Sequence, residues 1–218
     1  MSPVERLARE ISLFGSFAYF AVLVQSIVPS VRDLEQPRAG PVRAILSRRV
    51  LFLTSVAFLL VLKLLWRPIP VRIPSPWRDA LALVGLASFV SGFALALWGR
   101  VALGEMVAVS TSLEAPLHKD HKLVTGGPYA FVRHPMYLGD GLIAFGLLAI
   151  WRNWASAFLL LSAPGLVLRA KREEEALSHK FGDKWEAYAR RVPMLLPRPS
   201  LLIPRLERHK RPGHSSIV

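Results

Sequence analysis

The sequence predicts an all-α, polytopic membrane protein with about five transmembrane helices, the last two forming a helical hairpin, followed by cytoplasmic C-terminal helices. Hydrophobic residues make up 52% of the 218 positions and gather in long runs, as in membrane proteins. The absence of cysteine excludes disulfides and thiolate chemistry. The net charge is +13, but the basic residues flank apolar runs and no nucleic-acid-binding motif is present. A basic rim at a membrane is therefore expected, and no nucleic-acid partner.

Three apolar runs predict the first three spans: residues 11–31, 50–66 and 80–98. The first has no charge and, at about 1.5 Å rise per residue, is long enough to cross a bilayer. It is too long for a signal peptide and no cleavage motif follows it, so we expect it to be retained. The third run contains small residues suited to close helix contact: Gly85, Ser88, Ser91 and Gly92.

Two shorter apolar runs, residues 138–150 and 155–168, predict the hairpin. The polar turn between them, residues 151–154, carries a tryptophan at each end, a residue type that favours the membrane interface. With five spans and the C-terminus inside, the inner segments carry 21 Lys and Arg residues and the outer segments six. The positive-inside rule then places the 100–137 loop and the C-terminal segment on the cytoplasmic side.

Beyond the last span the pattern stays helical up to Gly182, which is expected to stop the helix. We expect Asp183 to cap a second helix over residues 184–191, which Pro193 ends. Residues 1–197 are predicted to form a single integral-membrane domain with its catalytic core at about 98–197. Residues 198–218 form a basic C-terminal tail.

The segment from His121 to Tyr137 is a polar, Gly/Pro-broken loop that runs directly into an apolar helix. Gly126, Gly127 and Pro128 predict a turn that leaves backbone N–H groups available to a ligand. After the last span, Arg169 and Glu173 lie four residues apart, on one helical face. Since His118 and His121 have no further ligands nearby and cysteine is absent, no metal site is expected. Asp140, near the start of the fourth span, is interpreted as a solvated helix-end residue.

Six separated motifs in this order resemble the isoprenylcysteine carboxyl methyltransferase family and, in part, the related phospholipid methyltransferases. They are Trp98-Gly-Arg, Leu103-Gly104, His121-x-Leu-Val-x-x-Gly-Pro-Tyr129, Val132-Arg-His-Pro-x-Tyr-Leu-Gly139, Glu173-Glu174 and Phe181-Gly-x-x-Trp-x-x-Tyr188-x-x-x-Val-Pro193. The resemblance covers about residues 98–197. Asp140 departs from it, because relatives usually carry an apolar or aromatic residue there.

The resemblance implies a membrane enzyme that transfers a methyl group from S-adenosylmethionine to a lipophilic small molecule or lipidated substrate and releases S-adenosylhomocysteine. It implies Arg169 as the catalytic and substrate-binding residue, and a weakly aligned cofactor contact at Glu114. The implied cofactor-binding residues are His121, Leu123, Val124, Tyr129, His134, Pro135, Met136, Tyr137 and Glu173.

The residue types suit that chemistry. A carboxylate such as Glu173 can hold a cationic cofactor, and Tyr129 and Tyr137 offer aromatic faces to adenine or to a sulfonium. A carboxylate is the acceptor that the family favours, and it needs only in-line placement and exclusion of water. The alternatives are an N- or S-methyltransferase for phospholipids or small molecules, an NADPH-dependent membrane reductase, and a non-enzymatic transporter or scaffold. The sequence leaves the oligomeric state open.

Overall fold

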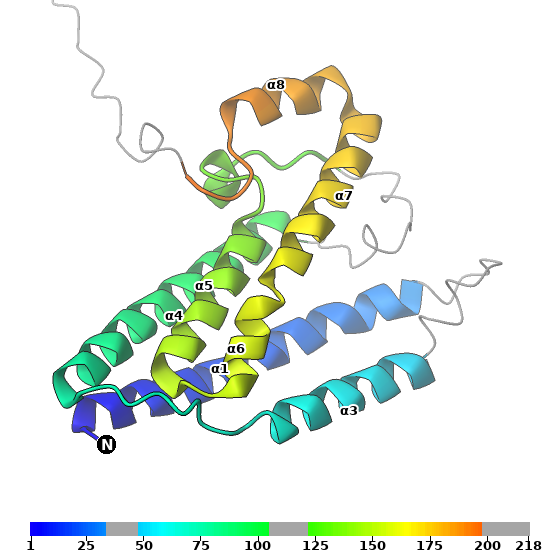
Figure 1. The fold of residues 1–218 in the computed structure, drawn as a ribbon. Coiled ribbons are helices and arrows are strands. Elements are labelled where there is room, and N and C mark those ends of the chain that lie inside the picture. The colour runs from blue at the N-terminus through cyan, green and yellow to red at the C-terminus, as the bar shows by residue number, and fades with distance from the viewer. Residues whose placement is uncertain (34–47, 105–121, 198–218) are drawn as a thin grey trace, which may run out of the picture.

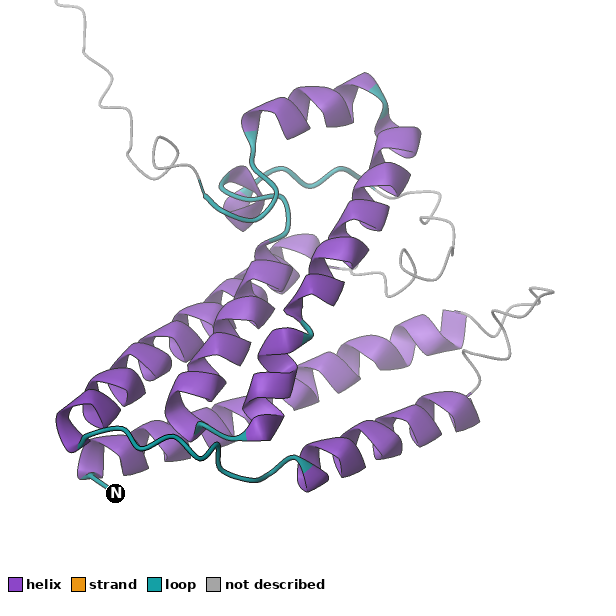
Figure 2. Cartoon of the chain, in the orientation of Figure 1, coloured by secondary structure: helices purple, strands orange, loops and turns teal. Residues whose placement is uncertain are grey.

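The computed structural model describes residues 1–33, 48–104 and 122–197. The predicted contacts His121 and Glu114 lie outside these residues. Helices joined by loops make up the described chain, with no strand in it (Figures 1 and 2), which confirms the all-α prediction. The elements are α1 (Pro3–Asp33), α3 (Arg48–Leu64), α4 (Ser75–Leu103), the 3-10 helix η3 (Gly127–Ala130), α5 (Pro135–Trp151), α6 (Trp154–Leu161), α7 (Ala163–Phe181) and α8 (Asp183–Arg191).

Helices α4 and α5 form the main packing interface among the described helices (Figure 1). Glycines at seven-residue spacing on each helix bring the two backbones together, because residues seven apart fall on the same face. A Cβ on Gly92 would lie 2.6 Å from the Gly139 carbonyl oxygen, and one on Gly146 would lie 2.6 Å from that of Gly85. The predicted small-residue contact is confirmed for Gly85 and Gly92, whereas Ser91 is exposed.

Gly139→Ala is expected to destabilise the fold, because its new methyl group would lie 2.6 Å from the Gly92 carbonyl oxygen and would force the helices apart. Overpacking of this kind costs about 1–3 kcal/mol. The melting temperature of the purified protein in detergent measures it. Gly141→Ala is the matched control, since a Cβ there meets nothing within 4 Å on the same helix. Equal melting temperatures for the two variants would show that the close approach is not required.

The turn between α5 and α6 confirms the predicted hairpin. Helix α5 ends at Trp151, Arg152 adopts a left-handed conformation with φ 48°, and α6 begins at Trp154. Asn153 caps α6: its side chain accepts a hydrogen bond from the Ser156 backbone N–H at 2.8 Å, and the Ser156 hydroxyl accepts one from the Asn153 backbone N–H in return. The left-handed Arg152 thus ends α5, and the reciprocal cap at Asn153 starts α6.

The predicted fifth span is divided in the structure. Residues 155–168 do not form one helix: α6 ends at Leu161 and α7 begins at Ala163. Pro164 lies in the first turn of α7. Proline lacks an N–H group and its ring crowds the preceding turn, so the helix is interrupted there. Helix α7 then continues without a break from the apolar run into the charged segment that ends at Phe181.

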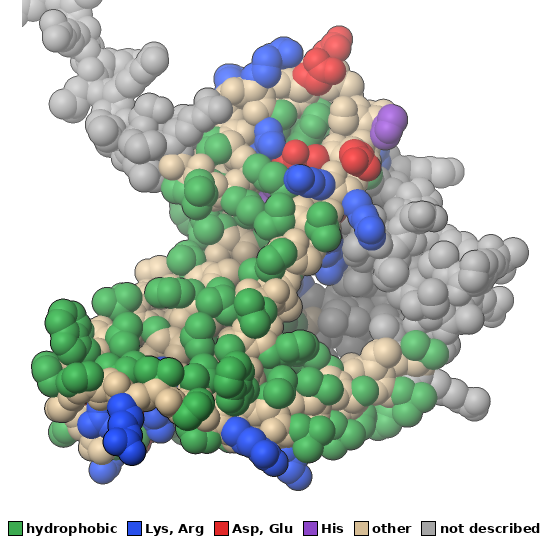
Figure 3. All heavy atoms as spheres, viewed as in Figure 1, with side chains coloured by type: hydrophobic (Ala, Val, Ile, Leu, Met, Phe, Trp, Pro, Cys, Tyr) green, Lys and Arg blue, Asp and Glu red, His purple; other side chains and the backbone are tan. Residues whose placement is uncertain are grey.

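One helix of the described chain, Ser75–Leu103, is long and apolar enough to cross a membrane, and Phe52–Leu64 and Pro135–Trp151 are shorter apolar helices. Hydrophobic side chains cover the middle of the molecule in Figure 3. Acidic, basic and histidine side chains gather over α7 and α8 at one end, and Lys and Arg lie at the opposite end. This distribution is typical of a membrane protein. The number of five spans stays a prediction.

The N-terminal helix is anchored to the hairpin turn by a buried ion-pair cluster. The Glu5 carboxylate, 3% exposed, pairs with Arg9 at 2.8 Å and with Arg152. The Trp151 indole N–H donates to the Ser12 hydroxyl at 3.0 Å. These contacts fix the position of α1 along α4 and α5.

Candidate active site

Helix α8 folds back over the loop that precedes α5 (Figure 1). Gly182 ends α7 with φ 50°, as predicted. The predicted cap by Asp183 is wrong: Gly182 is the N-cap, without a side-chain hydrogen bond, and Asp183 lies in the first turn. A carboxylate in that turn is still favourable, because it faces the positive end of the helix dipole.

The buried face of α8 packs on the loop through an aromatic cluster. Trp185, Tyr188 and Val192 form its core, and Leu123 packs against it. The Tyr188 hydroxyl donates to the backbone carbonyl of Tyr129 at 2.7 Å. Burial raises the pKa of Tyr188 to about 12, so the hydroxyl stays protonated and remains a donor. The cluster therefore holds the Gly-Pro-Tyr turn in place.

Arg133 joins the loop to both C-terminal helices. Its Nε and Nη2 donate to the two Glu174 carboxylate oxygens at 2.9 and 3.1 Å, a bidentate pair. Its Nη1 donates to the Ala189 carbonyl at 2.8 Å, and its guanidinium lies 5.8 Å from the Trp185 ring centroid. His134 Nε2 lies 3.1 Å from Glu174 Oε1. Glu174 is thus the structural anchor of the Arg-His-Pro motif.

Acid should release this anchor. Burial would raise the pKa of Glu174, but the hydrogen bond with His134 and the charge of Arg133 outweigh it and hold the pKa below its ordinary value of 4.5. A depressed pKa means that the stabilisation is fully present above pH 4.5 and is lost as the pH falls through the folded-state pKa.

Glu174→Gln is therefore expected to be less stable than wild type at neutral pH, by about 1–3 kcal/mol for a charged hydrogen-bonded group. This difference should shrink as the pH falls below 4.5. Melting temperatures across that range measure it. Glu175→Gln is the control, since Glu175 is exposed on the same helix. A difference that does not change with pH would contradict the role assigned to the carboxylate.

A second cluster lies on the neighbouring face of α7. The Tyr137 hydroxyl donates to Glu173 Oε1 at 2.5 Å, and Arg169 Nε lies 3.4 Å from the same oxygen. The Arg169 guanidinium lies 5.8 Å from the Tyr137 ring centroid. His134 stacks on Tyr137 with ring centroids 5.6 Å apart, and its Nδ1 is 3.9 Å from Glu173 Oε2. Four of the predicted site residues thus meet in one place: His134, Tyr137, Arg169 and Glu173.

The other predicted residues that the structure describes have different surroundings. Tyr129 is buried, and burial together with the negative charge of Glu173 raises the pKa of its phenol above the ordinary value. Pro135 and Met136 pack against Gly99 of α4, where a Cβ would lie 3.2 and 3.0 Å from their side chains. Leu123 contacts the aromatic cluster, and Val124 is half-buried. Pro135, Met136 and Leu123 thus have packing contacts that the sequence did not indicate.

Arg133 and Glu174 are not among the site residues that the sequence predicts. Both residues stand inside the motifs that carry the resemblance, and this was the signal that the sequence offered. Their pairing could not be identified from spacing, because the two residues are 41 positions apart.

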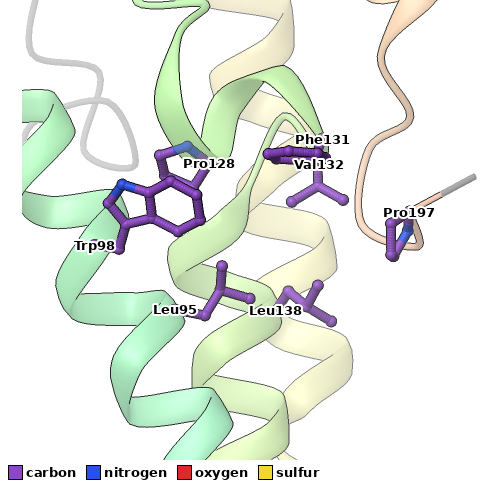
Figure 4. A pocket seen from close by; sticks show the side chains of 7 residues that line it. All are labelled: Leu95, Trp98, Pro128, Phe131, Val132, Leu138 and Pro197. Atoms are coloured by element: carbon purple, nitrogen blue, oxygen red, sulfur yellow. The ribbon is translucent and has the colours of Figure 1, made fainter. Parts of the chain in front are cut away.

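An apolar groove of about 300 Å³ lies beside η3 (Figure 4). It is lined by Leu95, Trp98, Pro128, Phe131, Val132, Leu138 and Pro197. A lining of this kind suits hydrocarbon and has no charged group for a cationic ligand. The polar cluster around Glu173 is therefore the better candidate for binding one.

The proteins to which this chain is similar include several methyltransferases. The phospholipid methyltransferase family matches residues 81–184. The chain is 41% identical over 86 residues to protein-S-isoprenylcysteine O-methyltransferase of Schizosaccharomyces pombe, covering 37% of this chain and 35% of that protein. It is 31% identical over 168 residues to methanethiol S-methyltransferase of a Pseudomonas species, covering 71% of this chain and 61% of that protein.

A second methanethiol S-methyltransferase, from Pseudomonas deceptionensis, is 31% identical over 186 residues, covering 80% of this chain and 68% of that protein. The chain thus spans between about a third and two thirds of the lengths of these three relatives. The motifs, the helical fold and these similarities agree. The chain belongs to the family of phospholipid and isoprenylcysteine methyltransferases.

Proposed function

We propose that this chain transfers a methyl group from S-adenosylmethionine to a lipophilic acceptor at the cytoplasmic surface of a membrane. The observation that carries the proposal is the Glu173 cluster. Its carboxylate is 18% exposed, accepts a hydrogen bond from Tyr137 and faces His134 and Arg169. A partly desolvated carboxylate with aromatic rings beside it suits a cationic ligand.

Each residue of the cluster would have its own role in binding the donor or orienting the acceptor. Glu173 would hold the positively charged part of the methyl donor, and the Tyr137 and Tyr129 rings would lie against its adenine or sulfonium. When bound, the donor supplies an electrophilic methyl group. Arg169 would orient the acceptor, because a guanidinium pairs with anionic groups in a fixed geometry. Helix α8, closed over the loop by Tyr188 and Arg133, would exclude water.

The proposal extends to topology and domain limits. Five spans with the C-terminus inside would place α7, α8 and the loop before α5 on the cytoplasmic side. Residues 1–197 would act as one domain with its catalytic core at about 98–197, and residues 198–218 as a basic tail. The gathering of charged side chains over α7 and α8 in Figure 3 supports this orientation.

Binding of labelled S-adenosylmethionine to the purified full-length protein in detergent tests the cofactor. NADPH should not compete with it; competition would favour a nicotinamide-dependent reductase. Incubation with lipid extracts and the labelled donor, followed by mass analysis, should then yield a methylated lipophilic product. A chain that binds neither cofactor would be better explained as a transporter or scaffold.

A further inference from the structure

Basic side chains gather at the end of the molecule that lies opposite α7 and α8 (Figure 3). Helices α1, α4 and α5 meet at this end in one buried contact, formed by Ala8, Ala82 and Ile150. An arginine stands within about one helical turn of each contact residue. The three arginines, called the arginine triad below, are Arg9 in α1, Arg78 in α4 and Arg152 at the end of α5.

The register of α1 on α4 brings Arg78 to the level of the other two arginines. Ser2 Oγ of α1 donates to Asp79 of α4 at 2.5 Å, and the next contact along both helices is the buried one just described. The two helices therefore run in the same direction, and Arg78 lies beside the first turns of α1. Glu5 stands in these turns and pairs with both other arginines of the triad.

The carboxylates at this end do not balance the arginine triad. Glu5 is buried and is shared between two guanidinium groups, and Asp79 accepts the hydrogen bond from Ser2. Among the described carboxylates at this end, only Glu10 is exposed. Further exposed arginines precede α4 or lie in α1: Arg6, Arg67 and Arg72. The surplus of positive charge attracts an anion.

Two arginines of the triad each have a nitrogen that is buried and unpaired. The Nε atoms of Arg9 and Arg78 are buried, and neither has a hydrogen-bond partner among the described residues. Arg152, in contrast, donates to the Ala149 carbonyl at 2.9 Å and to Glu5. A buried N–H of a charged group is costly without an acceptor. Phosphate oxygens are acceptors that match the geometry of a guanidinium.

Exposed tryptophans place this end at a membrane surface. Trp66, Trp77 and Trp154 are 53%, 66% and 49% exposed, and Trp77 directly precedes Arg78. Tryptophan favours the interface between lipid and water, at the level of the lipid headgroups. Exposed apolar side chains continue from there along α1 and α4, where acyl chains can lie. These neighbours favour the phosphate of a lipid over a free anion.

We propose that the arginine triad binds the phosphate of an anionic phospholipid, at the membrane surface opposite the candidate active site. The phosphate oxygens accept hydrogen bonds from the Nε groups of Arg9 and Arg78. Glu5 and the Trp151 ring, whose centroid is 5.2 Å from the Arg9 guanidinium, hold Arg9 in position for this contact. The site is independent of the proposed function, because neither the methyl donor nor the acceptor takes part in it.

Titration of the purified full-length protein in detergent with phosphatidylglycerol tests the site, with bound lipid counted by native mass spectrometry. Phosphatidylcholine with the same acyl chains is the matched lipid, because its headgroup has no net charge. Wild type should bind phosphatidylglycerol at least about fivefold more tightly, the scale for one basic side chain that acts on an anionic lipid. Equal affinities for the two lipids would overturn the proposal.

Arg78→Gln should weaken phosphatidylglycerol binding at least about fivefold. Its melting temperature without lipid should equal that of wild type, because the Arg78 side chain forms no hydrogen bond or ion pair with the described residues. Arg191→Gln is the control, since it removes the same charge from an exposed position on α8. Wild-type affinity in Arg78→Gln, or an equal loss in both variants, would contradict a site at the triad.

A salt series separates a defined site from diffuse attraction. Salt screens exposed charges strongly and partly buried charges much less. Arg72 is exposed at the same end, whereas Arg78 is half-buried. At high salt, Arg72→Gln should therefore bind the lipid as wild type does, and Arg78→Gln should remain weaker. Equal affinities of these two variants at high salt would show that the basic surface attracts lipid without a defined site, and the proposal would fail.

Arg9→Gln gives a second measurement within the triad. It loses the pair with Glu5, so its fold is expected to be less stable, and the quantity to compare is the rise in melting temperature that phosphatidylglycerol produces. This rise should be smaller than in wild type; a rise as large as in wild type would speak against the site. If Arg9→Gln does not fold, Arg78→Gln decides.

Excess inorganic phosphate distinguishes a lipid from a free anion at the same arginines. It should not displace phosphatidylglycerol from wild type, because the acyl chains also contribute to binding. Displacement of the lipid by phosphate would assign the triad to a free anion and overturn the lipid site.

Discussion

Glu173→Gln is expected to weaken binding of S-adenosylmethionine at least about tenfold, since a hydrogen bond to a charged group contributes about 1.5–3 kcal/mol and 1.4 kcal/mol corresponds to a factor of ten. The amide keeps the size of the side chain and can still accept the hydrogen bond from Tyr137. The substitution thus removes the negative charge and little else. Equilibrium binding of labelled cofactor to the purified protein measures the change.

Glu175→Gln provides the matched control on the same helix. Glu175 is exposed, so its loss should leave cofactor affinity unchanged. Unaltered binding in Glu173→Gln would remove the donor from this cluster. An equal loss in both variants would mean that the overall charge of α7, and not one carboxylate, attracts the cofactor.

Arg169→Lys is expected to lower the turnover rate by about 100-fold, the scale for removing one donor that stabilises charge in a transition state. Lysine keeps the positive charge but lacks the planar fork that fixes an acceptor in one orientation. The pairing of Arg169 with Glu173 is long, 3.4 Å, and the Arg169 side chain is 38% exposed. Its loss should therefore change cofactor affinity by no more than about threefold, since i,i+4 pairs with a solvent-exposed partner contribute little. Turnover at saturating donor, measured beside donor affinity, separates the two effects.

Arg172→Lys is the corresponding control, because Arg172 is exposed on the same helix. If Arg169→Lys lost cofactor binding and turnover in equal measure, Arg169 would be part of the donor site and its role towards the acceptor would be wrong.

The two consecutive glutamates show what a motif does not reveal. Successive residues of an α-helix point about 100° apart, so Glu173 and Glu174 must face different neighbours. The structure directs Glu173 to Tyr137 and Arg169, and Glu174 to Arg133 and His134. The resemblance implied a ligand role for Glu173. It could not indicate that the adjacent carboxylate anchors the loop.

Pro164 shows why hydropathy alone mispredicted the fifth span. It stands in the apolar run that predicts the fifth span, and proline is a known helix breaker. Hydropathy alone nevertheless extends the span across it, because apolar composition does not register a missing N–H group. The break at Ser162 separates α6 from α7.

The features that the sequence predicted correctly depend on the local chemistry of the chain. Apolar runs require helices, because backbone N–H and C=O groups must pair within each segment where water is absent. The polar residues at 151–154 and Gly182 end helices through their own backbone preferences. The Asp140–Tyr19 contact, the Arg133–Glu174 pair and the glycine interface of α4 and α5 depended on the tertiary structure. They join residues 121, 41 and 47 or more positions apart, and such contacts are set by how whole helices pack, which no local pattern records.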